Sequence, residues 1–447
     1  MEKTLTITRY PRALGEVSSQ VAGQQWVYQL TRAFQLSPTE FGLLVNIRLC
    51  AIRPVDIETG NDLVILDRLD QVEPKATIPL NRGEFGIHPR TVQRLLLSRY
   101  PLAGGFIPVG ACRADGSPHP HAGTGFAVSH VLGYPVDDAG NVAVYGLWEI
   151  PEADRHVMFE LQQYRYDGAT FTVEHSEMLN PEAVLPGWVF TSSPLSNSIA
   201  DGDDLIGGFV GYRVGSAAAT AGSGMTRWKW RDGRWRLMEF TPVPEAEGAF
   251  EPSMVRDGDN SLLFAVRGSS RSVLGEKEDP QKKSYLNDVR VWRSIDCGAT
   301  WTLVLHAPMV RAASPVSINK AADGTIYVAG NPHCATDHRG KGISISIAMR
   351  EILQLWPLSQ ERNRLLGPVL VCDGNREFGS PPFDSIWWED HPVGLTVRLG
   401  DGQWHHMLTF RVLEQSECAS DSPATPFTGT YLYEVLSTGP VKPEWVF

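Results

Sequence analysis

The chain has 447 residues, with 40 basic and 51 acidic side chains and a formal charge of −11 at pH 7. This acidic balance argues against a phosphate backbone or an anionic membrane surface as its partner. The 42 glycines and 31 prolines are typical of a turn-rich fold, and the length suits one large all-β domain as well as two or three average domains.

The six cysteines are scattered without a close pair, so we expect buried apolar side chains rather than disulfides or a zinc site. No apolar stretch is long enough to span a bilayer, and residues 1–12 lack the apolar core of a signal peptide. We expect a cytoplasmic protein as the sequence stands, or a secreted or periplasmic one if a signal has been removed.

The first 104 residues carry weak structural signals. Residues 41–52 are apolar enough for a pair of strands, and residues 91–100 suit either a short helix or a strand. We therefore predict an irregular N-terminal extension over residues 1–104 that contributes to the first repeat unit. Residues 105–447 are predicted to form one domain, because no linker, charge run or low-complexity stretch interrupts them.

From about residue 110 onwards a unit of similar composition recurs. It consists of a small or acidic residue followed by proline, an inner strand, an acidic turn and a second β-rich strand. Units begin near residues 117, 193, 251, 314 and 380. In the last of these we predict an inner strand over residues 382–388 and an acidic turn at Glu389-Asp390. A sixth unit is expected from the N-terminal region together with the strand at residues 430–436, since strands from both chain ends protect the edges.

A second repeat follows an Asp-Gly-aromatic order. Residues 294–301 read Ser-Ile-Asp-Cys-Gly-Ala-Thr-Trp, and weaker copies occur at residues 166–171 and 231–235. The aspartates of these segments, Asp167, Asp232 and Asp296, are 65 and 64 residues apart. Such regular spacing between short β-rich segments indicates the blade repeat of a β-propeller.

The segment at 294–301 resembles the Asp box, or BNR repeat, of sialidases and related β-propellers. The resemblance implies a tight turn between the two outer strands of a blade. In it the aspartate accepts backbone N–H bonds, the glycine has a positive φ and the tryptophan fills the blade. Over residues 105–415 the chain looks most similar to uncharacterised bacterial sialidase-family proteins. We therefore predict an all-β fold, a six-bladed sialidase-like β-propeller with an irregular N-terminal extension.

Two further segments resemble sialidases. Glu251 and Arg267 stand where the family has a glutamate that assists a catalytic tyrosine and an arginine that binds the substrate carboxylate. Asn331 precedes a loop with Arg339, at the place of another carboxylate-binding arginine.

The sequence also departs from the family. Phe383 or Asp384 stands where the catalytic tyrosine is expected, and Gly105-Phe106-Ile107-Pro108 lacks the arginine of the family's Phe-Arg-Ile-Pro. A sialidase mechanism that needs a tyrosine and three arginines is therefore not supported.

The inner strands of a propeller end at a common mouth, so residues from distant units can form one site there. Glu251 and Asp384 supply two carboxylates, the minimum for acid and base catalysis on a glycosidic bond. His119 and His121 stand two apart on an extended stretch and face the same side, which makes His121 a further catalytic candidate. The residues predicted to bind substrate are Arg267, Arg339, His119, Asn331, His333 and Trp388, of which Trp388 could stack on a sugar.

Each candidate also has an ordinary structural explanation. Arg267 could form an outward salt bridge, Asp384 could end a strand, and Trp388 could belong to the blade core. Histidines at 119, 121, 333 and 338 and a cysteine at 334 are suitable metal ligands, but their spacing matches no zinc pattern, so no metal or other cofactor is expected.

The favoured function is a glycoside hydrolase that acts on an acidic or terminal sugar at the central mouth. One alternative is a polysaccharide lyase that cleaves next to a uronate through histidine and arginine side chains. The other is a non-catalytic propeller that binds glycans. The expected partner is a carbohydrate, with an anionic one favoured, and neither a nucleic acid nor a membrane is expected; the oligomeric state is left open.

Overall fold

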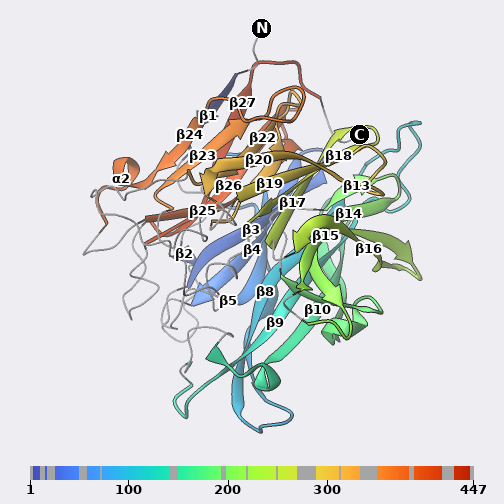
Figure 1. Ribbon diagram of the computed structural model, residues 1–447, viewed down its shortest axis with the longest axis vertical. Helices are drawn as coiled ribbons and strands as arrows, with labels where there is room; N and C mark the ends of the chain where they lie inside the picture. The colour runs from blue at the N-terminus through green and yellow to red at the C-terminus, as the bar shows by residue number, and fades with distance from the viewer. Residues whose placement is uncertain are drawn as a thin grey trace.

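The computed structural model describes residues 4–10, 16–17, 26–49, 58–70, 73–140, 142, 149–192, 198–217, 220–247, 250–268, 288–311, 314–332, 350–381, 387–414 and 427–442. Within these residues the strands form six separate sheets, arranged as the blades of a propeller (Figure 1). The predicted all-β, six-bladed fold is therefore confirmed. In the same residues the helical elements are α2 (Gly374–Glu377) and the 3-10 turns η2 (Glu152–Asp154) and η3 (Pro181–Ala183). None of the described helices is long and apolar enough to span a membrane.

The blades follow one another along the chain, and each is an antiparallel meander. Blade 1 contains β2 (Glu16–Val17), β3 (Trp26–Ser37), β4 (Glu40–Leu49), β5 (Glu58–Leu66) and β6 (Ala76–Arg82). Blade 2 contains β7 (Glu84–Ile87), β8 (Arg94–Ile107), β9 (Thr124–Pro135), β10 (His156–Tyr166) and β11 (Phe171–Leu179). Blade 3 contains β12 (Trp188–Ser192), β13 (Ile199–Asp201), β14 (Asp204–Arg213), β15 (Gly222–Arg231) and β16 (Arg234–Glu247).

The remaining three blades have four strands each among the described residues. Blade 4 contains β17 (Phe250–Gly258), β18 (Ser261–Arg267), β19 (Asp288–Ser294) and β20 (Thr302–Arg311). Blade 5 contains β21 (Ser317–Lys320), β22 (Ile326–Gly330), β23 (Ile352–Pro357) and β24 (Val369–Asp373). Blade 6 contains β25 (Trp387–Arg398), β26 (Trp404–Glu414), β27 (Gly429–Ser437) and, from the other end of the chain, β1 (Leu5–Thr8).

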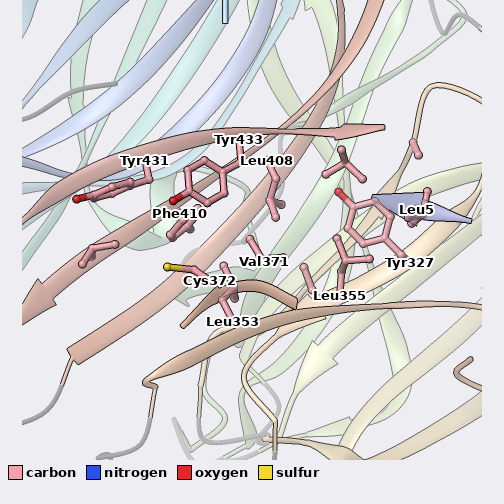
Figure 2. Packing of buried hydrophobic residues seen from close by; sticks show 14 of the residues in the cluster. Leu5, Tyr327, Leu353, Leu355, Val371, Cys372, Leu408, Phe410, Tyr431 and Tyr433 are labelled. Atoms are coloured by element: carbon pink, nitrogen blue, oxygen red, sulfur yellow. The ribbon is translucent and has the colours of Figure 1, made fainter. Parts of the chain in front are cut away.

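The two ends of the chain close the ring in blade 6. Strand β1 pairs antiparallel with β27, from Leu5 opposite Ser437 to Thr8 opposite Glu434, and the two lie side by side in Figure 1. Leu5 joins the buried cluster shared by blades 5 and 6, which Figure 2 shows with Tyr327 and aliphatic side chains around it. Pairing of strands from both ends, expected from the sequence, is therefore confirmed.

The rest of the N-terminal region differs from the expected irregular extension. It forms the whole of blade 1, and the predicted boundary at residues 104 and 105 falls inside the inner strand β8 of blade 2. The unit expected to begin near residue 117 is accordingly the second strand of that blade, β9. The reason is that both faces of β4 are buried: Phe41 and Leu43 pack into one cluster, and Leu44 packs into another. A strand buried on both faces loses the alternation by which strands are found in a sequence.

The three aspartates of the Asp-Gly-aromatic repeat lie in equivalent turns. Asp167, Asp232 and Asp296 lie in the turns between the two outermost strands of blades 2, 3 and 4, namely β10–β11, β15–β16 and β19–β20. Asp296 accepts hydrogen bonds from the hydroxyl and backbone N–H of Thr300 and from the Ser294 hydroxyl, which lower the pKa of Asp296 to about 2. Gly298 has φ 91° and Trp301 is buried, so the turn is built as the resemblance implied.

The central channel has two different ends. A cavity of about 280 Å³ is lined by residues from all six blades, each near the carboxyl end of its inner strand: Gln35, Phe106, Ala200, Arg256, Lys320 and Thr396. The six inner strands therefore point the same way around the axis. We call this end the lower mouth, and the end where the inner strands begin the upper mouth. Because each blade is a meander, the turns that hold the three aspartates lie on the lower side.

Candidate functional site

The inner strands carry irregularities near the upper mouth. The pairing register breaks between Tyr28 and Thr31 in β3, between Pro101 and Ala103 in β8, between Phe190 and Ser192 in β12, between Phe250 and Ser253 in β17, and between Asp390 and Val393 in β25. Such bulges bend a strand and turn side chains in a new direction, and they are common beside active sites. Blades from all around the ring can therefore direct side chains at one place.

Two of these bulges are strained. Glu251 has φ 50° and His391 has φ 54°, and each is followed by a proline. The left-handed region disfavours residues with a Cβ atom, by about 1 to 2 kcal/mol. Conformations of this cost persist where the surrounding structure enforces them, often at functional sites.

Glu251 and Arg267 form an ion pair at the strained bulge of blade 4. Arg267 Nη1 lies 2.8 Å from Glu251 Oε2, and the side chains are 15% and 14% exposed. They meet because Phe250, the residue before Glu251, is the partner of Arg267 across the β17–β18 hairpin. The structure thus brings together the two residues that the sequence had placed at the mouth.

The strained bulge of blade 6 carries a more elaborate group. Asp390 is fully buried, and both of its oxygens accept hydrogen bonds from Arg411, at 2.7 Å each. Arg350 contacts the same carboxylate, and His391 Nδ1 lies 2.7 Å from Asp390 Oδ1. Burial alone would raise the pKa of Asp390, but the charges of Arg411 and Arg350 and the hydrogen bond with His391 outweigh burial and hold this pKa well below its usual range. Burial lowers the pKa of His391 although Asp390 attracts the proton, so the neutral imidazole is favoured.

Blades 1 and 2 contribute to the same place. Arg32 on β3 is fully buried; burial lowers its pKa, and the nearby Tyr100 and Glu251 partly counteract this. Glu251 of blade 4 also acts electrostatically on His391 of blade 6, two blades further along the ring. Arg32 of blade 1 and His391 of blade 6 therefore both lie close enough to Glu251 of blade 4 to interact with it electrostatically. We call the following group the upper-mouth cluster: Arg32, Glu251, Arg267, Arg350, Asp390, His391 and Arg411.

His119 and His121 do not join this cluster. They lie in the connection from β8 to β9, which leaves the carboxyl end of an inner strand and so belongs to the lower side. His119 Nε2 lies 3.1 Å from the Gly202 carbonyl oxygen, and the other ring nitrogen accepts a hydrogen bond from the His121 backbone. The His121 ring stacks on Trp230, with the ring centroids 5.0 Å apart. Both histidines thus pack blade 2 against blade 3, at the end opposite Glu251.

Asn331 and Trp388 lie near the cluster but serve the junction of blades 5 and 6. The Asn331 amide nitrogen donates to the carbonyl oxygens of Ile352 and Glu389, at 2.8 Å each, and the side chain is fully buried. Trp388 is buried, and the Arg350 guanidinium carbon lies 4.7 Å from its ring centroid. The structure thus places Trp388 in the blade core, the ordinary alternative considered from the sequence.

The inner strand of blade 6 continues through the residues predicted to form a turn. Glu389 and Asp390, expected to form an acidic turn, lie inside β25, so the prediction of that turn is wrong. Two adjacent acidic residues suggest exposure, yet burial raises the pKa of Glu389 well above its usual range, and Asp390 is neutralised by arginines. Asp384, Arg339 and His333 lie outside the described residues, and their roles stay predictions.

Sequence reasoning missed Arg32, Arg350, Asp390, His391 and Arg411 as site residues. The sequence did contain a signal for these positions, because a proline stands at the bulge of several inner strands. The examples are Tyr100-Pro101, Glu251-Pro252 and His391-Pro392. The sequence had aligned blade 6 on Ser380-Pro381 instead. Within the described residues, no group of three or more His, Cys, Asp or Glu side chains is arranged to hold a metal ion.

Comparisons with known proteins give the class of fold. No protein-family model matches the chain, and no curated protein sequence matches it. Among solved structures, a protein of unknown function from Dyadobacter fermentans is similar over 98% of both chains, with a TM-score of 0.53 and 9% identity. The NanB sialidase from Streptococcus pneumoniae is similar over 96% of this chain and 70% of its own, with a TM-score of 0.50 and 10% identity. The chain therefore has the six-bladed β-propeller fold of sialidases.

Proposed function

We propose that this protein is a glycoside hydrolase that binds a terminal sugar at the upper mouth. The observation that carries the proposal is the setting of Glu251, a residue held in a strained conformation, paired with Arg267 at 2.8 Å and in electrostatic contact with Arg32 of blade 1 and His391 of blade 6. Strained residues of this kind cluster at active sites, where the surrounding structure holds a group in position. The likeness in fold to a sialidase supports a carbohydrate as the ligand.

Glu251 is the carboxylate of the cluster that can reach a ligand. Its side chain is partly exposed, whereas that of Asp390 is fully buried. We assign to Glu251 the role of a general base on water, or of an acceptor for a sugar hydroxyl. Asp384 stands three residues before β25 in the sequence and stays the predicted second carboxylate. Two carboxylates on different blades would be separated widely enough for a water molecule, which predicts inversion at the anomeric carbon.

His391 is suited to bind a sugar hydroxyl beside Glu251. Asp390 holds one ring nitrogen of this neutral imidazole, which fixes the orientation of the other. The lyase alternative relied on His119 and His121, and their position on the lower side leaves it with less support.

The test is a screen of the purified protein against neutral and acidic aryl glycosides and oligosaccharides, followed by substitution. Glu251→Gln should lower turnover at least about a hundredfold, as removal of a positioned acid or base does. The matched control is Glu239→Gln, because Glu239 is an exposed residue on the outer strand of blade 3. Full activity of Glu251→Gln would refute the assignment, and a wild-type protein inactive on the whole panel would refute the proposed function.

A further inference from the structure

Two arginines of the upper-mouth cluster converge on one carboxylate. The Arg411 guanidinium donates through Nε and Nη2 to the two oxygens of Asp390, at 2.7 Å each, and Arg350 contacts the second oxygen as well. A planar guanidinium fork opposite a planar carboxylate, strengthened by a second arginine, is the arrangement with which proteins bind anionic ligands. In this protein the carboxylate is part of the chain.

The arrangement leaves no room for exchange with a ligand. Asp390 is fully buried, and the side chains of Arg350 and Arg411 are nearly so. A substrate anion that took the place of Asp390 would leave this aspartate buried without its partners, which is strongly unfavourable. Arg350 is further fixed by its contact with the Trp388 ring.

The other arginines of the cluster also face a carboxylate of the protein. Arg267 is paired with Glu251, and the fully buried Arg32 lies near the same residue. Among these residues, the most exposed side chains are those of the Arg267–Glu251 ion pair, at 15% and 14%, followed by the neutral His391 imidazole at 9%. An ion pair has no net charge, so together with a neutral imidazole it suits the hydroxyl groups of a sugar better than a second carboxylate.

We propose that Asp390 permanently occupies the anion position of the upper mouth, and that the sugar bound there is uncharged, with hydroxyl groups that donate to Glu251 and His391. This inference rests on the proposed function, because that function supplies the sugar at the upper mouth. It replaces the acidic substrate expected from the sequence, because Arg267, predicted to bind the substrate carboxylate, already holds Glu251.

The first experiment empties the anion position. Asp390→Ala leaves Arg350 and Arg411 without their carboxylate, and free acetate or formate should then fill the space. We expect the thermal midpoint of Asp390→Ala to rise saturably with sodium acetate or sodium formate, compared with sodium chloride at equal ionic strength. Wild-type protein should respond equally to the three salts. Asp390→Asn is the matched control: its amide fills the space, so it should show no response specific to carboxylates.

The second experiment uses the wild-type protein alone and so does not depend on the folding of a variant. Calorimetric titration with N-acetylneuraminate, glucuronate and glucose compares two acidic sugars with a neutral one. We expect neither acid to bind more tightly than glucose. Tighter binding of an acid that is lost in Arg411→Met would overturn the inference, and so would an Asp390→Ala protein that folds but responds equally to acetate and chloride. If Asp390→Ala is recovered only in acetate or formate, that recovery supports the inference; if it is recovered in no salt, the titration decides.

Failure of the inference can be told apart from failure of the proposed function. The acetate response needs no catalysis, so a protein that hydrolyses no glycoside but shows this response would lose the proposed function and keep Asp390 in the anion position. A protein that hydrolyses acidic glycosides through Arg411 would keep the function and lose the inference.

Discussion

Leu5→Ala tests whether the ring is closed by the two ends of the chain. Leu5 is 4% exposed and packs in the cluster of blades 5 and 6, next to Tyr327 in Figure 2. Replacing a buried leucine by alanine removes apolar burial and leaves a cavity, which together cost about 2 to 5 kcal/mol. An unfolding entropy of about 2.1 cal/mol/K per residue, summed over 447 residues, converts this cost into a decrease of about 2 to 5 °C in the thermal midpoint.

The assay is thermal unfolding followed by circular dichroism, with urea unfolding as a second measurement. Thr6→Ala is the matched control, because Thr6 is the next residue of β1, pairs with Leu436 and is exposed. It should leave the midpoint within about 1 °C of the wild-type value, as exposed substitutions usually do. Equal midpoints for Leu5→Ala and the wild-type protein would refute the docking of β1 in blade 6.

Three further predictions concern buried hydrogen bonds and pH. Tyr327→Phe removes the hydroxyl that lies 2.6 Å from Nε2 of the neutral, buried His406, and should cost about 1 to 3 kcal/mol in urea unfolding; an unchanged midpoint would contradict it. The hydrogen bond with Glu434 raises the pKa of His405, so this residue stabilises the fold fully below its unfolded pKa of about 6.5 and loses the effect as the pH rises through the folded value. The difference in thermal midpoint between wild type and His405→Gln should shrink as the pH increases, and a difference independent of pH would refute this. Asn331→Asp turns an acceptor towards two carbonyl oxygens and should lower stability by about 2 to 5 kcal/mol; retention of full stability would contradict the structural role of Asn331.

The fold could be predicted from local chemistry because turns are local. The segment at 294–301 specifies its own geometry through a serine, an aspartate, a glycine and a threonine within a few residues, and the same spacing recurs in two neighbouring blades. The N-terminal region offered no such signal. Strand β4 of this region is buried on both faces, so its apolar residues do not alternate with polar ones. Blade 1 was therefore not recognised in the sequence, although its strands are regular.

The site was less accessible to prediction because its members are brought together only by the ring. Glu251 and Arg267 could be predicted as a pair since one hairpin joins them. Arg32 and His391 stand more than half the chain apart, on the inner strands of blades 1 and 6, and nothing in their local sequence indicates that they lie near Glu251. A pair of acidic residues in a buried strand also contradicts the usual rule that such residues mark turns.

These violations of local rules are themselves informative about function. A sequence that only had to fold would place glycine where φ is positive and apolar residues inside β25, yet this chain places Glu251, Asp390 and His391 there. The fold tolerates the acidic residue because Arg350 and Arg411 neutralise it, and it tolerates both strained residues because each is fixed in a bulge between two regular stretches of strand. So many supporting side chains are needed only if holding Glu251 and His391 in these positions matters more than the stability of the fold. The upper mouth is therefore where a ligand is expected, independently of the likeness to any other protein.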